Sequence, residues 1–272
     1  MVSSSTVATP ESRLPEAVRA AVLARTGPLR AVRIHGQGRN NDLAALLTPM
    51  SGPVVFLKAL HEDRPQSWTQ AREAAVNPYV LSCAPQLLWS LADGGWHVNA
   101  FEALQARAAR YAPGSNDLVP IVELLTTLSQ AGPAPEGLGL SQMPARMSSL
   151  STDAGVLAGT TLLHTDWNPT NVQVTVDGLR LVDWAWASVG AAWVDAAGWC
   201  VWLIRAGHTP AGAEAWALRV PVLADTDPTH VDVFAEATAT LWAGAATQRG
   251  STWHADLAAA AAAWSEHRRM RR

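Results

Sequence analysis

Residues 164–184, HTDWNPTNVQVTVDGLRLVDW, constrain the fold of this chain more than any other segment. A loop rich in His, Asp and Asn is followed by two short apolar runs around the dipeptide Asp177-Gly178. Asp-Gly between alternating apolar residues favours a β-hairpin with a two-residue type I′ turn. In that register Val172 faces Asp183, so the hairpin returns Asp183 to the polar loop from which it began.

The polar loop and the returning strand predict a convergence of three oxygen-bearing side chains, Asp166, Asn171 and Asp183. In ideal register Asn171 and Asp183 would point to opposite faces, so Asn171 is expected before the regular strand, where Pro169 favours an irregular backbone. One carboxylate and one amide oxygen suit Mg²⁺, which retains water and shares phosphate oxygens. A second carboxylate outside the metal shell could accept a proton from an attacking hydroxyl. These are the groups that phosphoryl transfer requires.

The spacing H-x-D-x-x-x-x-N, followed by a hairpin and the Asp of LVDW, resembles the aminoglycoside phosphotransferase and small-molecule kinase family. The resemblance implies an α+β, two-lobed protein-kinase-like fold with a small antiparallel β-rich N-lobe and a larger helical C-lobe. It implies that Asp166 is the catalytic base, that Asn171 and Asp183 hold Mg²⁺, and that ATP or GTP is the donor. His164 would be a structural residue of the loop, and Asp195 a structural helix residue that hydrogen-bonds it.

Lys58 is the single lysine among the 20 Lys and Arg residues of the chain. It lies in the predicted strand VVFLKAL, at the place of the family's strand lysine that pairs with the α- and β-phosphates. Glu73, fifteen residues later on a predicted helix, resembles the ion-pair partner of that lysine. Chance retention of one lysine in a strand is the alternative explanation.

The donor nucleotide would have further contacts upstream and downstream of this lysine. The segment HVNAFEAL resembles the family's hinge strand, where backbone groups of Glu102 to Leu104 would bind a purine edge. HGQGRNND supplies Gly36 and Gly38 but not the complete G-x-G-x-x-G pattern, and an ordinary hairpin turn explains these glycines nearly as well.

The order of predicted elements divides the chain. Alternating apolar residues separated by Gly- and Pro-containing turns predict a mostly β segment with one helix that begins after Ser67 as N-cap. Helical periodicity then dominates, beginning with DLVPIVELLTTLSQ. We therefore predict a disordered leader over 1–12, a nucleotide-binding N-terminal lobe over 13–101, and a helical C-terminal lobe over 102–272 that carries the catalytic loop and the acceptor site.

Composition excludes several classes of partner. A formal net charge of −3 gives no reason to expect nucleic acid. Cys83 and Cys200 are far apart, which argues against a disulfide framework and favours the cytoplasm. The N-terminus lacks a signal-peptide pattern, and the most apolar stretch contains Asp195, so no membrane association is expected.

The acceptor is expected to be a small hydroxylated molecule. Eleven residues separate Asp183 from Asp195 and no A-P-E occurs, so a peptide-presenting activation segment has no room. Thr165 stands where protein kinases have Arg in H-R-D, which is typical of the small-molecule branch. The mild acidity of residues 196–272 does not decide between an aminoglycoside or other antibiotic, a sugar and an amino alcohol.

Other interpretations of the same residues are weaker. Asp166 and Asn171 could only cap a turn, and His164 could be a core histidine. An H-x-D metal pair for hydrolysis lacks a second His-rich ligand set. A non-catalytic kinase-like nucleotide-binding module is the main alternative, but such a module does not need the predicted base.

Overall fold

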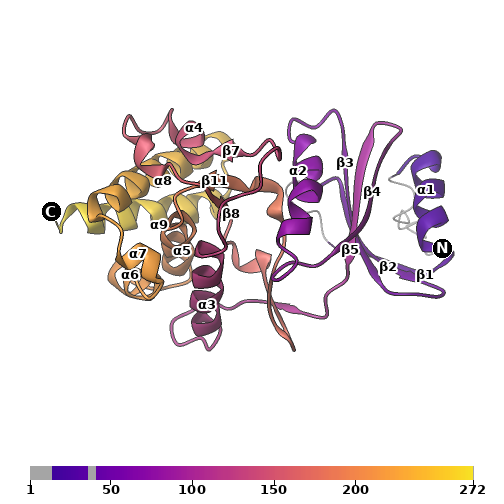
Figure 1. Cartoon of the computed structure of the whole chain (residues 1–272), viewed down its shortest axis with the longest axis horizontal. Coiled ribbons are helices and arrows are strands. Elements are labelled where there is room, and N and C mark those ends of the chain that lie inside the picture. The colour runs from indigo at the N-terminus through magenta and orange to yellow at the C-terminus, as the bar shows by residue number, and fades with distance from the viewer. Residues whose placement is uncertain (1–13, 36–40, 272) are drawn as a thin grey trace, which may run out of the picture. The chain divides into compact units, whose positions relative to one another are not determined.

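The computed structural model describes residues 14–35 and 41–271, and the chain divides into two compact units, Met1–Gln105 and Ala106–Arg272 (Figure 1). The predicted leader over 1–12 and the glycines Gly36 and Gly38 lie outside the described residues. The boundary between the units follows β5, which ends at Glu102.

The first unit is built on an antiparallel sheet with the strand order β1-β2-β3-β5-β4. Its strands are β1 (Leu29–His35), β2 (Leu43–Pro49), β3 (Val55–His61), β4 (Leu87–Asp93) and β5 (Trp96–Glu102). The strands match the predicted β-rich lobe, because apolar alternation and tight turns specify them; consecutive strands pair except that β3 pairs with β5 and not with β4. Helix α2 (Trp68–Val76) runs into the 3₁₀ turn η2 (Asn77–Tyr79).

Two details of this unit differ from expectation. Helix α1 (Glu16–Thr26) was not predicted, and its buried Val18 and Val22, one turn apart, pack in the core with sheet residues such as Leu57. Ser67 does precede α2, but it has helical backbone angles and its hydroxyl makes no capping hydrogen bond within the described residues.

The second unit combines helices with short strands. Its helices are α3 (Leu118–Ser129), α4 (Met143–Met147), α5 (Val194–Arg205), α6 (Pro210–Ala217), α7 (Pro221–Ala224), α8 (Pro228–Arg249) and α9 (Thr252–Arg269), with 3₁₀ turns η3 (Ala154–Leu157), η4 (Pro169–Asn171) and η5 (Trp184–Trp186). Small sheets have the orders β10-β9-β6 and β7-β11-β8. Their strands are β6 (Arg107–Ala108), β7 (Ser141–Gln142), β8 (Thr161–Leu163), β9 (Val172–Thr175), β10 (Gly178–Leu181) and β11 (Ser188–Gly190).

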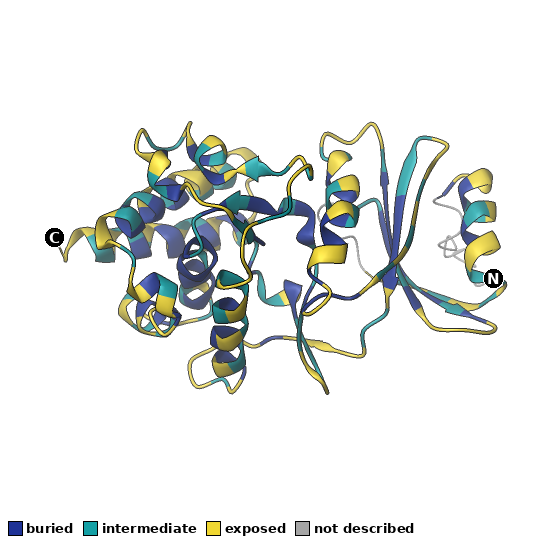
Figure 2. Ribbon diagram, in the orientation of Figure 1, coloured by how far each residue is buried: buried dark blue, intermediate teal, exposed yellow. Residues whose placement is uncertain are grey.

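Helix α5 lies in the core of the second unit, where it packs against α6 and α9 (Figure 2). Its burial explains the apolar composition of this stretch of sequence, and Asp195 in its first turn is buried with it. None of the helices that the structure describes has the length and apolar composition to span a bilayer.

The β9–β10 hairpin forms, but the predicted register is wrong. Val172 pairs with Leu181, whereas the prediction paired it with Asp183. The loop is Val176-Asp177, and the positive φ of 116° falls on Gly178, the first residue of β10. A type I′ turn needs positive φ at both loop residues, whereas in this hairpin the residue with positive φ is Gly178, directly after the loop. Asp183 therefore lies beyond the end of the paired strand.

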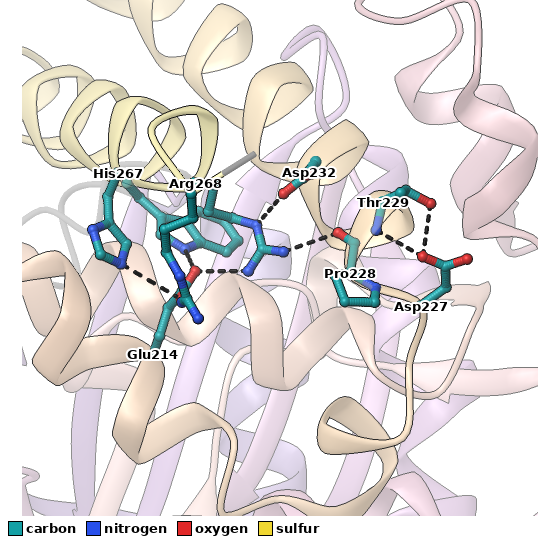
Figure 3. Close-up of polar contacts among 9 residues, drawn as sticks. Glu214, Asp227, Pro228, Thr229, Asp232, His267 and Arg268 are labelled. Atoms are coloured by element: carbon teal, nitrogen blue, oxygen red, sulfur yellow. Dashed lines mark hydrogen bonds and ion pairs between the residues drawn. The ribbon is translucent and has the colours of Figure 1, made fainter.

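A buried ion-pair network joins α6, α8 and α9 (Figure 3). Arg268 donates from Nε to Asp232 Oδ1 at 2.6 Å, from Nη1 to Glu214 Oε1 at 2.7 Å, and from Nη2 to the Pro228 carbonyl at 2.9 Å. Trp264 Nε1 donates to the same Glu214 oxygen at 2.9 Å. Both carboxylates are buried, so the guanidinium offsets two negative charges inside the helical unit.

Candidate active site

The candidate site in the second unit begins at His164, which directly follows β8 and is fully buried. The backbone N–H of Asp166 donates to His164 Nδ1 at 3.2 Å, and His164 Nε2 lies 3.0 Å from the Val182 carbonyl. Because Nδ1 accepts, Nε2 carries the proton and donates. The neutral imidazole thus ties the polar loop to the end of the hairpin.

Asp195, in the first turn of α5, holds the same loop by its backbone. Its two carboxylate oxygens accept the backbone N–H groups of His164 and Thr165, each at 2.8 Å. Burial raises the pKa of Asp195, and these two hydrogen bonds act against that rise. A carboxylate with both oxygens committed to backbone has a positioning role in this geometry.

Asp166 is held at both carboxylate oxygens. The N–H of Asn168 donates to Oδ1 at 3.3 Å, and Asn171 Nδ2 donates to Oδ2 at 3.0 Å. Burial, and then the charge of Asp183, raise the pKa of Asp166 to about 6. The carboxylate is therefore ionised at neutral pH and still basic enough to take up a proton.

Asn171 ends the 3₁₀ turn η4, directly before β9, as its predicted position required. Its amide nitrogen donates to the backbone oxygen of Asp166 at 3.1 Å as well as to the carboxylate, so its amide oxygen lies on the opposite branch of the carboxamide. The Asn171 carbonyl accepts from the N–H of Val182 at 2.8 Å. This bond brings Asp183, the next residue, beside the loop, and Asp183 adopts a left-handed φ of 67°.

The oxygen atoms of Asn171 and Asp183 are too few to coordinate a metal ion by themselves, but they suit Mg²⁺ that is also coordinated by water and phosphate oxygens. Among the residues that the structure describes, no group of three or more His, Cys, Asp or Glu side chains could hold a metal ion. Asp183 and Asn171 would instead supply one carboxylate and one amide oxygen. Mg²⁺ commonly binds one or two such protein ligands and completes its shell with water and phosphate oxygens.

The first unit contains the predicted lysine on β3 in a buried ion pair. Lys58 Nζ lies 2.8 Å from Glu73 Oε1 and 3.0 Å from Oε2, and both residues are buried. Glu73 comes from α2, so the pair joins the helix to the sheet. The Lys58 ammonium also lies 5.8 Å from the ring centre of Phe101. The Glu73 carboxylate and the Phe101 ring thus both contact the Lys58 ammonium.

The predicted hinge residues lie at the end of β5. The N–H of Glu102 donates to the carbonyl of Gln86 at 2.9 Å, so this donor is already engaged within the first unit. Leu104 follows in irregular chain, two residues past the strand. Gly36 and Gly38, the candidates for a phosphate-binding turn, lie outside the described residues.

Sequence reasoning missed Arg146 in α4. Its Nη1 lies 2.9 Å from Thr165 Oγ1, 3.0 Å from the Trp186 carbonyl and 2.6 Å from Ser188 Oγ. Nothing in the sequence around Arg146 marks it, because these partners are between 19 and 42 residues away and meet only through tertiary structure. Tyr111 was missed as well: it is buried, and burial and the charge of Asp166 both raise its pKa.

Comparison with known proteins relates this fold to phosphotransferases. No family model matches the sequence, and no curated protein matches it. A thermostable mutant of aminoglycoside phosphotransferase APH(4)-Ia, in ternary complex with ADP and hygromycin B, matches with a TM-score of 0.65 at 12% identity over 93% of this chain and 98% of that chain. Choline kinase LicA from Streptococcus pneumoniae matches with a TM-score of 0.66 at 14% identity over 93% and 99%.

A mutant of aminoglycoside 2′-phosphotransferase-IIIa in complex with GDP matches with a TM-score of 0.62 at 13% identity over 94% of this chain and 97% of that chain. At such identities the likeness concerns the fold. The chain therefore has the predicted two-lobed, protein-kinase-like fold of these enzymes, and the resemblance to the aminoglycoside phosphotransferase and small-molecule kinase family is confirmed at that level.

Proposed function

We propose that this chain is a small-molecule kinase that transfers the γ-phosphoryl group of ATP or GTP to a hydroxyl of a small acceptor. One observation carries the proposal: Asp166, with a raised pKa, is hydrogen-bonded to Asn171 beside Asp183, in a chain with the fold of phosphotransferases. A loop that only capped a turn would not need to hold the Asp166 carboxylate in a desolvated position close to a second carboxylate.

Asp166 would act as the general base. As the acceptor oxygen forms its bond to the γ-phosphorus, the hydroxyl proton passes to the Asp166 carboxylate. The bond between the γ-phosphorus and the β–γ bridging oxygen breaks, and that oxygen leaves with the bonding electrons as part of the nucleoside diphosphate. The donors at Asn168 and Asn171 orient the carboxylate and leave a lone pair for the proton.

Asn171 and Asp183 would hold Mg²⁺ through the amide and carboxylate oxygens. When bound, the ion would supply positive charge against the phosphate oxygens of the donor. The hydrogen bond from Asn171 Nδ2 to Asp166 also turns the Asn171 amide oxygen away from Asp166. Asp166 would then act as the base, and Asp183 would bind the metal ion together with the amide oxygen.

Residues of the first unit would bind the donor. Lys58, oriented by Glu73, is suited to the α- and β-phosphates because its ammonium is a compact charge with three donors. Backbone groups within Glu102 to Leu104 would bind the purine, with the Glu102 N–H excluded because it is donated to Gln86. Similar structures bind ADP and GDP, which supports a purine nucleotide without choosing between ATP and GTP.

The acceptor class is a small hydroxylated molecule. The similar structures include one with hygromycin B bound and one choline kinase, so this fold serves chemically different acceptors. Two of the acidic residues in the C-terminal half, Glu214 and Asp232, are paired with Arg268 and provide no unbalanced negative charge for a polycation. An aminoglycoside is therefore one candidate beside other antibiotics, sugars and amino alcohols.

The test is nucleotide turnover with Mg²⁺ over a panel of such acceptors. We expect acceptor-dependent release of ADP or GDP that falls by about 100-fold or more in Asp166→Ala and in Asp183→Ala. Asp177→Ala is the matched control, because this carboxylate is exposed in the hairpin loop of the same segment. Nucleotide binding without consumption of any acceptor would favour the non-catalytic binding module, and absence of nucleotide binding would refute both.

A further inference from the structure

Two residues of the candidate site have a strained backbone conformation. Among the described residues, the non-glycine residues with positive φ are Thr165 and Asp183, each at 67°. Thr165 directly precedes Asp166, and Asp183 is one of the two candidate metal ligands. A β-branched residue is particularly disfavoured in the left-handed region, because its Cβ substituents crowd the backbone. Such conformations persist only where the surrounding structure enforces them.

One guanidinium contacts both strained segments. Arg146 Nη1 is shared between Thr165 Oγ1 at 2.9 Å and the carbonyl of Trp186 at 3.0 Å. The Thr165 hydroxyl donates to that same carbonyl at 2.9 Å, so the three groups form a closed triangle of hydrogen bonds. Trp186 ends the turn η5, whose N-cap residue is Asp183. The triangle thus joins the residue before Asp166 to the turn after Asp183.

Arg146 itself is anchored from outside both segments. It belongs to α4, and its Nη1 also donates to Ser188 Oγ in β11 at 2.6 Å. Its guanidinium lies 5.7 Å from the ring centre of Trp186. A planar, permanently charged donor can hold several acceptors in fixed directions, which a lysine ammonium on a flexible stem cannot do equally well.

We propose that Arg146 is a positioning residue that fixes the strained backbone beside Asp166 to the turn that begins at Asp183, through the Thr165 hydroxyl and the Trp186 carbonyl. This inference rests on the proposed phosphotransferase activity for its functional meaning. The hydrogen bonds of Arg146 reach the backbone beside Asp166 and Asp183 through Thr165 and Trp186, and its positive charge also lowers the pKa of Asp166. The consequence is a fixed distance between Asp166, the proposed base, and Asp183, a proposed metal ligand.

Steady-state kinetics test the functional part. Arg146→Met and Thr165→Val, which removes the hydroxyl at nearly constant shape, should each lower kcat by about 10- to 100-fold, with the nucleotide KM changed less than about 3-fold. Thr165→Ser restores the hydroxyl and should recover most of kcat. The double variant Arg146→Met with Thr165→Val should be no slower than the slower single variant, because both break one triangle.

Arg219→Met is the matched control. Arg219 also stacks on a tryptophan, with its guanidinium 4.5 Å from the ring centre of Trp216, but at the end of α6. It should leave kcat unchanged. Unchanged kcat in Arg146→Met, a rise in KM alone, or multiplicative effects in the double variant would overturn the proposal. The Val and Ser variants keep the test decisive if Arg146→Met does not fold.

Hydrogen exchange tests the proposal without any turnover. In Arg146→Met, amides in residues 164–168 and in 183–188 should exchange faster together, by about 10-fold, with α8 unchanged. Faster exchange in only one segment, or in neither, would contradict the proposal. If the wild-type chain turns over no acceptor, the proposed function fails while this measurement still decides whether Arg146 couples the two segments.

Discussion

The Asp166 carboxylate is ionised against two opposing forces, burial and the negative charge of Asp183. The donors at Asn168 and Asn171 offset part of that cost. A residue kept under such conditions destabilises the folded chain when it is charged, which is typical of groups retained for chemistry. The effect of Asp166 on the stability of the folded chain can therefore be used to test its proposed role without knowing the substrate.

Asp166→Asn should stabilise the metal-free protein at neutral and alkaline pH. The folded pKa of about 6 exceeds the ordinary value of 3.8, so the folded state binds the proton more tightly. Wild-type stability from this group is thus highest below its unfolded pKa and is lost as pH rises through about 6. With a chelator present, the stability advantage of the variant should be larger near about pH 8 than near about pH 5, by about 1–2 kcal/mol. An equal advantage at both pH values would contradict this assignment.

The residues of the loop were predictable to different degrees. His164, Asp166 and Asn171 follow from a fixed local spacing, and their mutual hydrogen bonds span at most five residues. Thr165 was identified as a departure from H-R-D, but its positive φ was not, because Thr rarely adopts it. Arg146 could not be predicted, since its contacts arise only when α4 packs beside the loop.

At the scale of elements, β8 and β11 approach closely near the start of the candidate site. They pair antiparallel, with Gly190 opposite Thr161, and Gly159 lies just before β8. A methyl group at Gly159 would lie 2.6 Å from the Ala191 backbone nitrogen and closer still to the Gly190 carbonyl. The atoms that such a methyl group would meet belong to the backbone of Gly190 and Ala191, which cannot move aside as a flexible side chain could.

Gly159→Ala should therefore destabilise the second unit by about 1–3 kcal/mol, the range expected when extra atoms are forced into a packed position. Gly155→Ala is the matched control, because a methyl group there meets no atom within 4 Å and the φ is not positive. Denaturant unfolding followed by tryptophan fluorescence measures both. Equal midpoints for the two variants would show that the crossing is looser than described.

The elements themselves were predicted where local signals are strong. The sheet strands of the first unit follow from apolar alternation and tight turns. The hairpin was predicted from Asp177-Gly178, yet its register was wrong because that dipeptide was assigned to a type I′ loop, whereas Gly178 opens β10. Helix α1 was missed because Pro15 at its N-cap has no capping side chain, although Glu16 in its first turn and Gly27 after its last residue are helix-end signals.

At the scale of the whole molecule, fold class could be predicted because a short ordered motif implies a complete architecture. No family model matches the sequence, yet similar structures cover more than nine-tenths of the chain. The packing of the C-terminal helices was beyond that motif. Their buried ion pairs join residues that are 36 and 54 positions apart, and nothing local specifies which charges meet.

Arg268→Met should cost about 3 kcal/mol or more in unfolding free energy, because buried Asp232 would lose its ion-pair partner while Glu214 would keep its partly exposed pair with Arg271. Arg269→Met is the control one position along the same helix. Its ion pair with Glu266 is largely exposed, so its loss should change stability by less than about 1 kcal/mol. A similar cost for both variants would contradict the importance assigned to burial. Urea titration of the whole chain provides the comparison.

The fate of the γ-phosphoryl group tests the central claim most directly. Nucleotide labelled in the γ-phosphate, with Mg²⁺ and the acceptor panel, should yield label covalently attached to one class of acceptor. That transfer should be lost in Asp166→Ala and Asp183→Ala and retained in Asp177→Ala. Label found only in inorganic phosphate, or equal transfer by Asp166→Ala, would contradict the account.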